Sequence, residues 1–342
     1  MAPWMELPYQ MKNVTAEEDK IIRKCLPGFT RPFIKCGENG YLMPGQWKKH
    51  AEGIYNMQVR PDDVWVITFP RSGTTWVQEM VWLAENDLDY ITAKEVPLFK
   101  RFPMLETTSI LPELTFELIK LNFFNLGKFQ GLDEAVRVDS WKPIDKAPSP
   151  RFIKTHLPLS MLPPALLSTA KVVYVARDPR DVAVSYYYLH KMCGKKLLRA
   201  NVGHFWEAFR RDLLPWTPIV AHANEAYTKR HHPNLHFIYY EDMKKDLAKE
   251  VKAVCKFLNK DYSDIQIKTL AEHLSFDNLK KSKTVNNGTG DIIQFVRKGE
   301  AGGWKEHFDD KMQVQAEEFL ASRLKGVELR YPSFPLNEIT RL

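Results

Sequence analysis

The sequence predicts one α/β domain spanning residues 1–342, with a mostly parallel central sheet flanked by helices and a P-loop-like strand–loop–helix. Three observations support this fold class. Predicted strands and helices alternate along the chain, and no linker-like stretch interrupts them. Residues 171–177 form a continuous apolar run of the kind found in parallel sheets. A loop of small and hydroxyl-bearing residues, 69–76, joins a predicted strand to a predicted helix.

The first 60 residues are expected to form an irregular N-terminal arm. It contains one charged helical piece, residues 15–24, in which Thr15 and Glu18 are spaced as a capping box. Further along, residues 97–150 carry many Pro and Phe residues with weak periodicity. Two interpretations of this segment stay open: connecting helices packed on the core, or an apolar lid over a substrate pocket.

Apolar periodicity and β-branched runs place the other elements. The predicted strands cover residues 64–68, 151–155, 171–177 and 235–240. The predicted helices cover residues 75–84, 179–188, 202–214, 218–231, 247–258, 263–273 and 311–324. Pro179 suits the first turn of its helix, where a missing N–H has no consequence.

Composition narrows the class of protein. The chain is 44% hydrophobic and carries a net charge of +7, which indicates a full core and a modest basic excess. No basic run or zinc-finger spacing supports nucleic-acid binding. The four cysteines form no C-x-x-C pair, which favours reduced thiols over disulfides or a metal site. Because the chain has no apolar leader and no run of about 18 apolar residues, we expect a soluble, cytoplasmic protein.

The loop Phe69-Pro70-Arg71-Ser72-Gly73-Thr74-Thr75-Trp76 has the features of a phosphate site. Backbone N–H groups at the start of a helix bind anions, and the helix dipole favours negative charge there. Arg71 adds a positive charge, and the hydroxyls add donors. The triphosphate P-loop, G-x-x-x-x-G-K-[ST], does not fit, because its first glycine is missing and Thr74 replaces its lysine. We therefore expect a phosphate loop of another kind, with a Ser/Thr-rich helix cap as the alternative.

Polar residues follow several predicted strands. Arg71, His156, Arg177 and Tyr240 all lie at or just after a strand end. Ligands of open parallel sheets bind outside the carboxyl ends of the strands. A single histidine in such a position is more often structural than catalytic, but four polar groups together predict a ligand site at this edge.

Five motifs occur in order between residues 60 and 308. They are residues 69–76, Lys154-Thr155-His156-Leu157-Pro158, residues 175–187, Tyr240-Glu241-Asp242-Met243 and residues 297–305. Together they resemble the motifs of the cytosolic sulfotransferases. The first is similar to the 5′-phosphosulfate loop of that family, the second to the segment of its catalytic base, and the third to its 3′-phosphate motif. Residues 51–57 also resemble the branch of the family that contains retinol dehydratase.

The resemblance implies an enzyme that transfers the sulfuryl group of 3′-phosphoadenosine 5′-phosphosulfate (PAPS) to an acceptor hydroxyl and releases the nucleotide PAP. No metal is expected, because side chains meet the charge of the donor. Residues 97–150 favour a small apolar acceptor, such as a phenol, a steroid or a retinoid-like alcohol.

Matching positions assign donor-binding residues. The resemblance places the 5′-phosphate at residues 71–75 and the 3′-phosphate at a second basic cluster, where Gly299 allows a close backbone approach. Adenine is expected against aromatic side chains; for Trp76, a core position is the alternative. The expected donor-binding residues are Arg71, Ser72, Gly73, Thr74, Thr75, Trp76, Arg177, Ser185, Tyr240, Leu274, Phe276, Leu279, Phe295, Arg297, Lys298 and Gly299.

The resemblance also assigns catalytic roles. His156 matches the general base, a role that suits a neutral histidine with a pKa of about 6.5. Lys154 and Arg71 match cations that stabilise charge on the bridging oxygen, and Ser185 matches a residue that gates the reaction.

Two departures from the family pattern stand out. Arg71 occupies a position where most members have lysine. Arginine keeps the positive charge but replaces the compact ammonium group by a planar guanidinium group. A homodimer is compatible with the family, but the usual Lys-x-x-x-Thr-Val segment is absent, since no Thr-Val follows Lys305. Gly303, where Asp is common, is a smaller difference.

Other functions stay open alongside sulfuryl transfer. A dehydratase would act through a sulfated alcohol intermediate, and a non-catalytic protein would bind a nucleotide or lipid without transfer. The Lys154 and His156 pair argues against the non-catalytic alternative. A P-loop kinase is the weakest candidate, because its glycine and lysine are missing.

Overall fold

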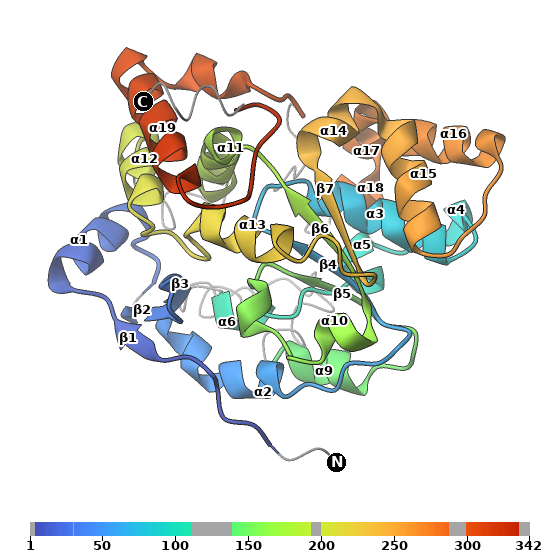
Figure 1. Cartoon of the computed structure of the whole chain (residues 1–342), viewed down its shortest axis with the longest axis horizontal. Helices are drawn as coiled ribbons and strands as arrows, with labels where there is room; N and C mark the ends of the chain where they lie inside the picture. Colours follow the sequence, from blue (N-terminus) through green and yellow to red (C-terminus); the bar gives the residue numbers. More distant parts are fainter. Residues whose placement is uncertain (1–3, 30, 111–138, 193–199, 287–298, 335–342) are drawn as a thin grey trace, which may run out of the picture.

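The structure is a computed structural model that describes residues 4–29, 31–110, 139–192, 200–286 and 299–334. Its centre is a four-stranded sheet in the order β5-β4-β6-β7 (Figure 1). These strands are β4 (Val64–Thr68), β5 (Phe152–Thr155), β6 (Lys171–Ala176) and β7 (Leu235–Tyr239). All three pairings are parallel, with Val64 opposite both Phe152 and Lys171. The predicted α/β class and the four predicted strands are confirmed.

Helices cover both faces of this sheet (Figure 1). One face carries α3 (Thr74–Glu85), α4 (Tyr90–Glu95), α5 (Leu98–Arg101), α14 (Tyr240–Lys245), α15 (Leu247–Phe257), α16 (Asp264–His273), α17 (Phe276–Lys281) and α18 (Lys283–Asn286). The other face carries α11 (Pro179–Met192), α12 (Val202–Arg210), α13 (Ile219–Tyr227) and α19 (Asp310–Leu324). Short pieces complete the chain: α6 (Thr107–Ile110), α9 (Trp141–Lys146), η2 (Leu159–Met161), α10 (Leu166–Thr169) and η3 (Gly303–His307).

The strands supply side chains to two cores. Val64 and Val66 pack into the core beneath α3 and α15, whereas Trp65 and Ile67 pack into the core on the opposite face. Alternation follows from the two-residue period of a strand. Because both faces are buried, β4 is apolar along its length and its polar groups are confined to the carboxyl end.

The N-terminal region is more regular than predicted. Residues expected to form an irregular arm build a second, antiparallel sheet of β1 (Met11–Asn13), β2 (Phe33–Cys36) and β3 (Tyr41–Pro44), followed by η1 (Gly45–Lys49) and α2 (Ala51–Tyr55). The predicted capping box is confirmed at α1 (Ala16–Cys25). Leu42 ties this sheet to the main body, since its N–H donates to Thr217 O at 2.9 Å and its carbonyl accepts from Trp216 N at 2.8 Å.

The segment 97–150 is described only at its two ends, so the choice between core helices and a lid stays a prediction. Its first part lies against β5: Lys154 N donates to Pro103 O at 2.9 Å, and Leu105 N donates to Lys154 O at 2.8 Å. Its last part returns to the same place, where Ser140 Oγ donates to Leu105 O at 2.6 Å. The phenylalanines at 116, 123, 124 and 129 lie outside the described residues.

Helix boundaries differ from the predicted ones by a few residues. The helix that begins at Pro179 extends to Met192 instead of ending at 188, and α12 ends at Arg210 instead of 214. Tyr240, expected as the last residue of a strand, is the first residue of α14. The turn at the end of β7 comes one residue earlier because residues 240–245 form a helical turn of their own.

Candidate active site

The predicted strand–loop–helix is present between β4 and α3. Two residues of the loop have left-handed backbone conformations: Arg71 with φ of 68° and Gly73 with φ of 101°. A Cβ atom on Gly73 would lie 2.8 Å from Cδ2 of Tyr240, so that only glycine fits without displacing the ring. Thr74 then begins α3, whose first turn carries no acidic residue. The loop therefore presents the positive end of a twelve-residue helix close to the arginine that precedes it.

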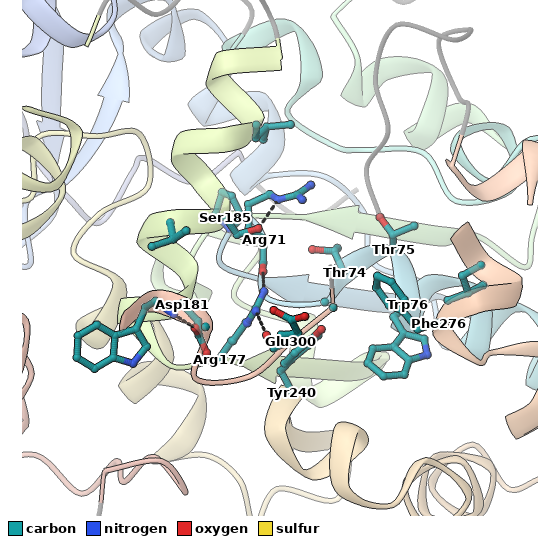
Figure 2. Close-up of a pocket in the computed structure, with 18 of the residues that line it drawn as sticks. Arg71, Thr74, Thr75, Trp76, Arg177, Asp181, Ser185, Tyr240, Phe276 and Glu300 are labelled. Atoms are coloured by element: carbon teal, nitrogen blue, oxygen red, sulfur yellow. Dashed lines mark hydrogen bonds between the residues drawn. The ribbon is translucent and has the colours of Figure 1, made fainter. Parts of the chain in front are cut away.

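This loop forms one wall of a pocket at the carboxyl edge of the sheet (Figure 2). The pocket brings together most of the site residues expected from the sequence. Those that line it are Arg71, Gly73, Thr74, Thr75, Trp76, Lys154, His156, Arg177, Ser185, Tyr240, Phe276, Leu279 and Gly299.

Two of the expected residues, Ser72 and Leu274, are not among the described residues that line the pocket. Ser72 is a buried residue of the loop itself, and Leu274 is buried with its carbonyl accepting from Trp76 Nε1 at 2.8 Å. Phe295, Arg297 and Lys298 lie outside the described residues. The roles of these three, including the expected phosphate contacts, stay predictions.

Arg71 and Arg177 are joined to each other, to helix α11 and to the loop at residue 300 (Figure 2). Arg71 Nε donates to Ser185 Oγ of α11 at 3.0 Å. Arg177 Nη1 donates to the carbonyl of Arg71 at 3.1 Å, and its Nη2 donates to the carbonyl of Glu300 at 2.8 Å. The guanidinium of Arg177 also lies 4.1 Å from the centre of the Tyr240 ring, within cation–π range.

Aromatic side chains shape the opposite wall. The rings of Trp76 and Tyr240 meet edge to face at 5.6 Å. Phe276 closes against Gly299, whose φ is +66° and whose Cβ, if present, would lie 2.1 Å from the Phe276 ring. Asp181, which the sequence did not single out, shapes the adjoining loop by accepting from Gly302 N at 2.7 Å and from Trp304 N at 3.1 Å.

His156 is buried, and its hydrogen bonds fix its tautomer. Its Nδ1 lies 2.8 Å from the carbonyl oxygen of Thr68, which can only accept, so Nδ1 carries the proton and Nε2 keeps its lone pair. Burial, and then the charge of Lys154, hold the pKa of His156 well below its usual value of 6.5. At neutral pH the ring is therefore uncharged and able to take a proton.

Two further side chains hold the main chain of His156, and sequence patterns missed both. Glu106 Oε1 accepts from His156 N at 2.7 Å, and His222 Nε2 donates to His156 O at 2.9 Å. Because the His156 carbonyl can only accept, Nε2 of His222 carries the proton, and its Nδ1 accepts from the hydroxyl of Tyr174 on β6 at 2.6 Å. Neither His222 on α13 nor Glu106 before α6 belongs to a motif. The available signal in the sequence was Tyr174, a residue with a polar hydroxyl inside an otherwise apolar strand.

Lys154 supplies a cation beside His156. Burial lowers its pKa to about 8, the carboxylate of Glu106 opposes this shift, and the charge of Arg71 adds to it. Lys154 is thus protonated at neutral pH and close to losing its proton in mild alkali. Across the described ranges there is no cluster of His, Cys, Asp and Glu that could hold a metal ion, and no helix is long and apolar enough to span a bilayer.

Comparison with known proteins gives consistent matches. Residues 61–328 match a family described as a sulfotransferase domain. Human Sulfotransferase 1E1 is 30% identical over 301 residues, which covers 86% of this chain and 94% of that protein. The luciferin sulfotransferase of Photinus pyralis is 29% identical over 323 residues, covering 90% and 83%.

Solved structures extend the match over nearly the whole chain. Retinol dehydratase in complex with retinol and PAP superposes with a TM-score of 0.87 at 40% identity, covering 96% of this chain and 100% of that one. Retinol dehydratase in complex with androsterone and inactive cofactor PAP gives the same TM-score at 38% identity and the same coverage.

Proposed function

The chain belongs to the sulfotransferase family and is a PAPS-dependent sulfotransferase, and from this premise we propose that it sulfates the hydroxyl of a small apolar acceptor with His156 as the general base. The observation that carries this assignment is the tautomer of His156. Its Nδ1 proton is held by the Thr68 carbonyl at 2.8 Å, which leaves Nε2 as the basic atom of a residue that lines the pocket.

Two observations support the fit of a nucleotide with two phosphate groups. Arg177, which lines the pocket, has a buried Nε without a hydrogen-bond partner among the described residues. The close approach at Gly73 and at Gly299 leaves backbone where a side chain would otherwise stand. We assign the 5′-phosphate to the loop 71–75 and the 3′-phosphate to Arg177 and Ser185, with Arg297 and Lys298 added by motif.

When bound, the donor supplies the sulfuryl group and a nucleotide leaving group. His156 then accepts the proton of the acceptor hydroxyl at Nε2 as that oxygen becomes a nucleophile. Lys154 and Arg71 place positive charge where negative charge develops on the leaving phosphate oxygen. Arg71 is oriented for this by its bond to Ser185, which places Ser185 in the same step.

The solved relatives support an apolar acceptor. The two retinol dehydratase structures, at 40% and 38% identity, were obtained with retinol and with androsterone. We therefore propose a retinoid, steroid or comparably apolar alcohol. The same similarity favours a second candidate function, the dehydration of an alcohol through its sulfate ester.

The test uses the purified full chain with saturating PAPS and a panel of retinoid, steroid and phenolic alcohols. A sulfate ester is expected as the product, whereas a product lighter than the alcohol by one water supports dehydration.

Replacing His156 by alanine is expected to lower kcat by about 10²- to 10⁴-fold, as for loss of a general base. His236→Ala is the matched control, because His236 lies on β7 outside the pocket wall. Undiminished turnover of His156→Ala would refute the base assignment.

A further inference from the structure

Glu106 is a fully buried carboxylate that stands behind the active site without lining the pocket. Both of its carboxylate oxygens accept hydrogen bonds from residues at the carboxyl end of β5. Oε1 accepts from His156 N at 2.7 Å, and Oε2 accepts from Thr155 Oγ1 at 2.8 Å. Thr155 Oγ1 in turn accepts from Leu157 N at 3.0 Å, so the carboxylate anchors three consecutive residues around the base.

The backbone that carries Glu106 is itself fixed. The residues just before it run beside β5, with Lys154 bonded on both sides to Pro103 O and Leu105 N. Ser140 Oγ donates to Leu105 O at 2.6 Å. This bond joins the segment that begins at residue 139 to the residue just before Glu106. A rigid attachment of this kind suits a residue that must hold another in place.

We propose that Glu106 is a positioning residue, which fixes the main chain of His156 and maintains the positive charge on the neighbouring Lys154. The proposal rests on the proposed function, since it presupposes that His156 is the base. Glu106 acts through these two residues and has no contact with the pocket.

Charge interactions support the second part of this proposal. The charged groups that act on Lys154 are Glu106 before α6 and Arg71 on the loop after β4, and Lys154 in turn acts on His156 of its own segment. Of these, Glu106 alone among the described residues favours the protonated ammonium. Burial raises the pKa of Glu106 to about 7, while its bonds to His156 N and Thr155 and the charge of Lys154 oppose that rise. The carboxylate is thus ionised above about pH 7, so that Glu106 and Lys154 are both charged between about pH 7 and pH 8, the range in which Lys154 begins to lose its proton.

The test compares Glu106→Gln with the wild-type full chain. Glutamine keeps the size of the side chain but removes its charge. We expect kcat to fall about 10- to 100-fold, as for a small displacement of a catalytic group, with the Kd of PAP within threefold of wild type. We also expect the alkaline midpoint of kcat/KM for PAPS, near pH 8 in the wild type, to move to lower pH, because this profile follows the free enzyme and Lys154 would lose its proton more readily.

Glu79→Gln is the matched control. Glu79 is equally buried, but it pairs with Arg101 at 2.7 Å and lies outside the pocket wall. This variant is expected to lower Tm while kcat and the alkaline midpoint stay at wild-type values. A general loss of stability would affect both variants alike.

Glu106→Asp keeps the charge and shortens the side chain. It is expected to restore the wild-type alkaline midpoint but not the wild-type kcat, and it carries the test if Glu106→Gln does not fold. Wild-type kcat in either variant, or an unmoved alkaline midpoint in Glu106→Gln, overturns the proposal. If His156→Ala keeps full turnover, the assignment of His156 as the base in the proposed function is refuted. If His156→Ala loses activity but the Glu106 variants keep it, the positioning role of Glu106 is refuted and the base assignment stands.

Discussion

Replacing Gly73 by alanine is expected to weaken the binding of PAP by about 5- to 150-fold. Gly73 has φ of 101°, a conformation in which a residue with a Cβ carries strain on the order of 1–3 kcal/mol. If the loop changes its conformation to relieve this strain, the conformation that binds PAP becomes less stable by the same free energy. At about 1.4 kcal/mol per factor of ten in Kd, that free energy corresponds to the stated loss of affinity.

A steric effect adds to the strain. The new Cβ would lie 2.8 Å from Tyr240 Cδ2, whereas ordinary contact begins at 3.4 Å, so the ring must retreat by about 0.6 Å (3.4 − 2.8). Tyr240 supports the guanidinium of Arg177 at 4.1 Å and the Trp76 ring at 5.6 Å. The substitution therefore disturbs both ends of the proposed donor site and not only the loop.

The assay is calorimetric titration of PAP into the purified variant, with thermal unfolding measured in parallel. Gly326→Ala is the control: Gly326 has φ of +80°, no atom lies within 4 Å of the point where a Cβ would stand, and it follows α19 outside the pocket wall. It is expected to lower Tm through the same backbone strain and leave the Kd of PAP unchanged. If Gly73→Ala binds PAP within twofold of wild type while Gly326→Ala loses stability, the account of the loop is wrong.

Three further variants separate binding from stability. Arg177→Lys is expected to raise the Kd of PAP at least tenfold, because lysine cannot make both carbonyl bonds and the contact with Tyr240; calorimetry with PAP checks this, and a donor analogue lacking the 3′-phosphate should be affected less. Trp76→Phe leaves the buried Leu274 carbonyl without its donor and is expected to lower the free energy of unfolding by about 1–3 kcal/mol in urea titrations. Asp63→Asn breaks the buried, two-bond pair with Arg151 and is expected to remove about 3–5 kcal/mol of unfolding free energy with kcat unchanged, measured by denaturation and steady-state assay.

The sequence was sufficient where the determining residues are adjacent along the chain. The strand, loop and helix of 64–85 could be predicted because β-branched residues, small loop residues and helical spacing follow one another directly. The N-terminal sheet could not, because β1 has three residues, of which Met11 alone is apolar, and its pairing with β2 is set by contacts distant in sequence.

The same distinction applies to the active site. His156 and Lys154 lie in one recognisable segment, and the carboxyl edge of the sheet brings them to the loop after β4. The residues that hold His156 are far away in sequence: Glu106 lies 50 positions before it and His222 lies 66 positions after it. Neither has a spacing that a pattern could detect, since their meeting depends on how the segment 103–106 and helix α13 pack against β5.

The two ends of the proposed donor site are joined by hydrogen bonds and packing contacts. Two motifs read separately therefore describe the site incompletely. Arg177, from the motif matched to the 3′-phosphate, donates to the carbonyl of Arg71 in the motif matched to the 5′-phosphate. Its guanidinium rests on Tyr240, and Tyr240 fills the space that Gly73 leaves open. A change at either end must therefore displace the other, because residues in one hydrogen-bonded and packed network do not act independently. Such coupling holds the loop ready for a ligand with two phosphates, and it limits what a single phosphate group can gain by binding alone.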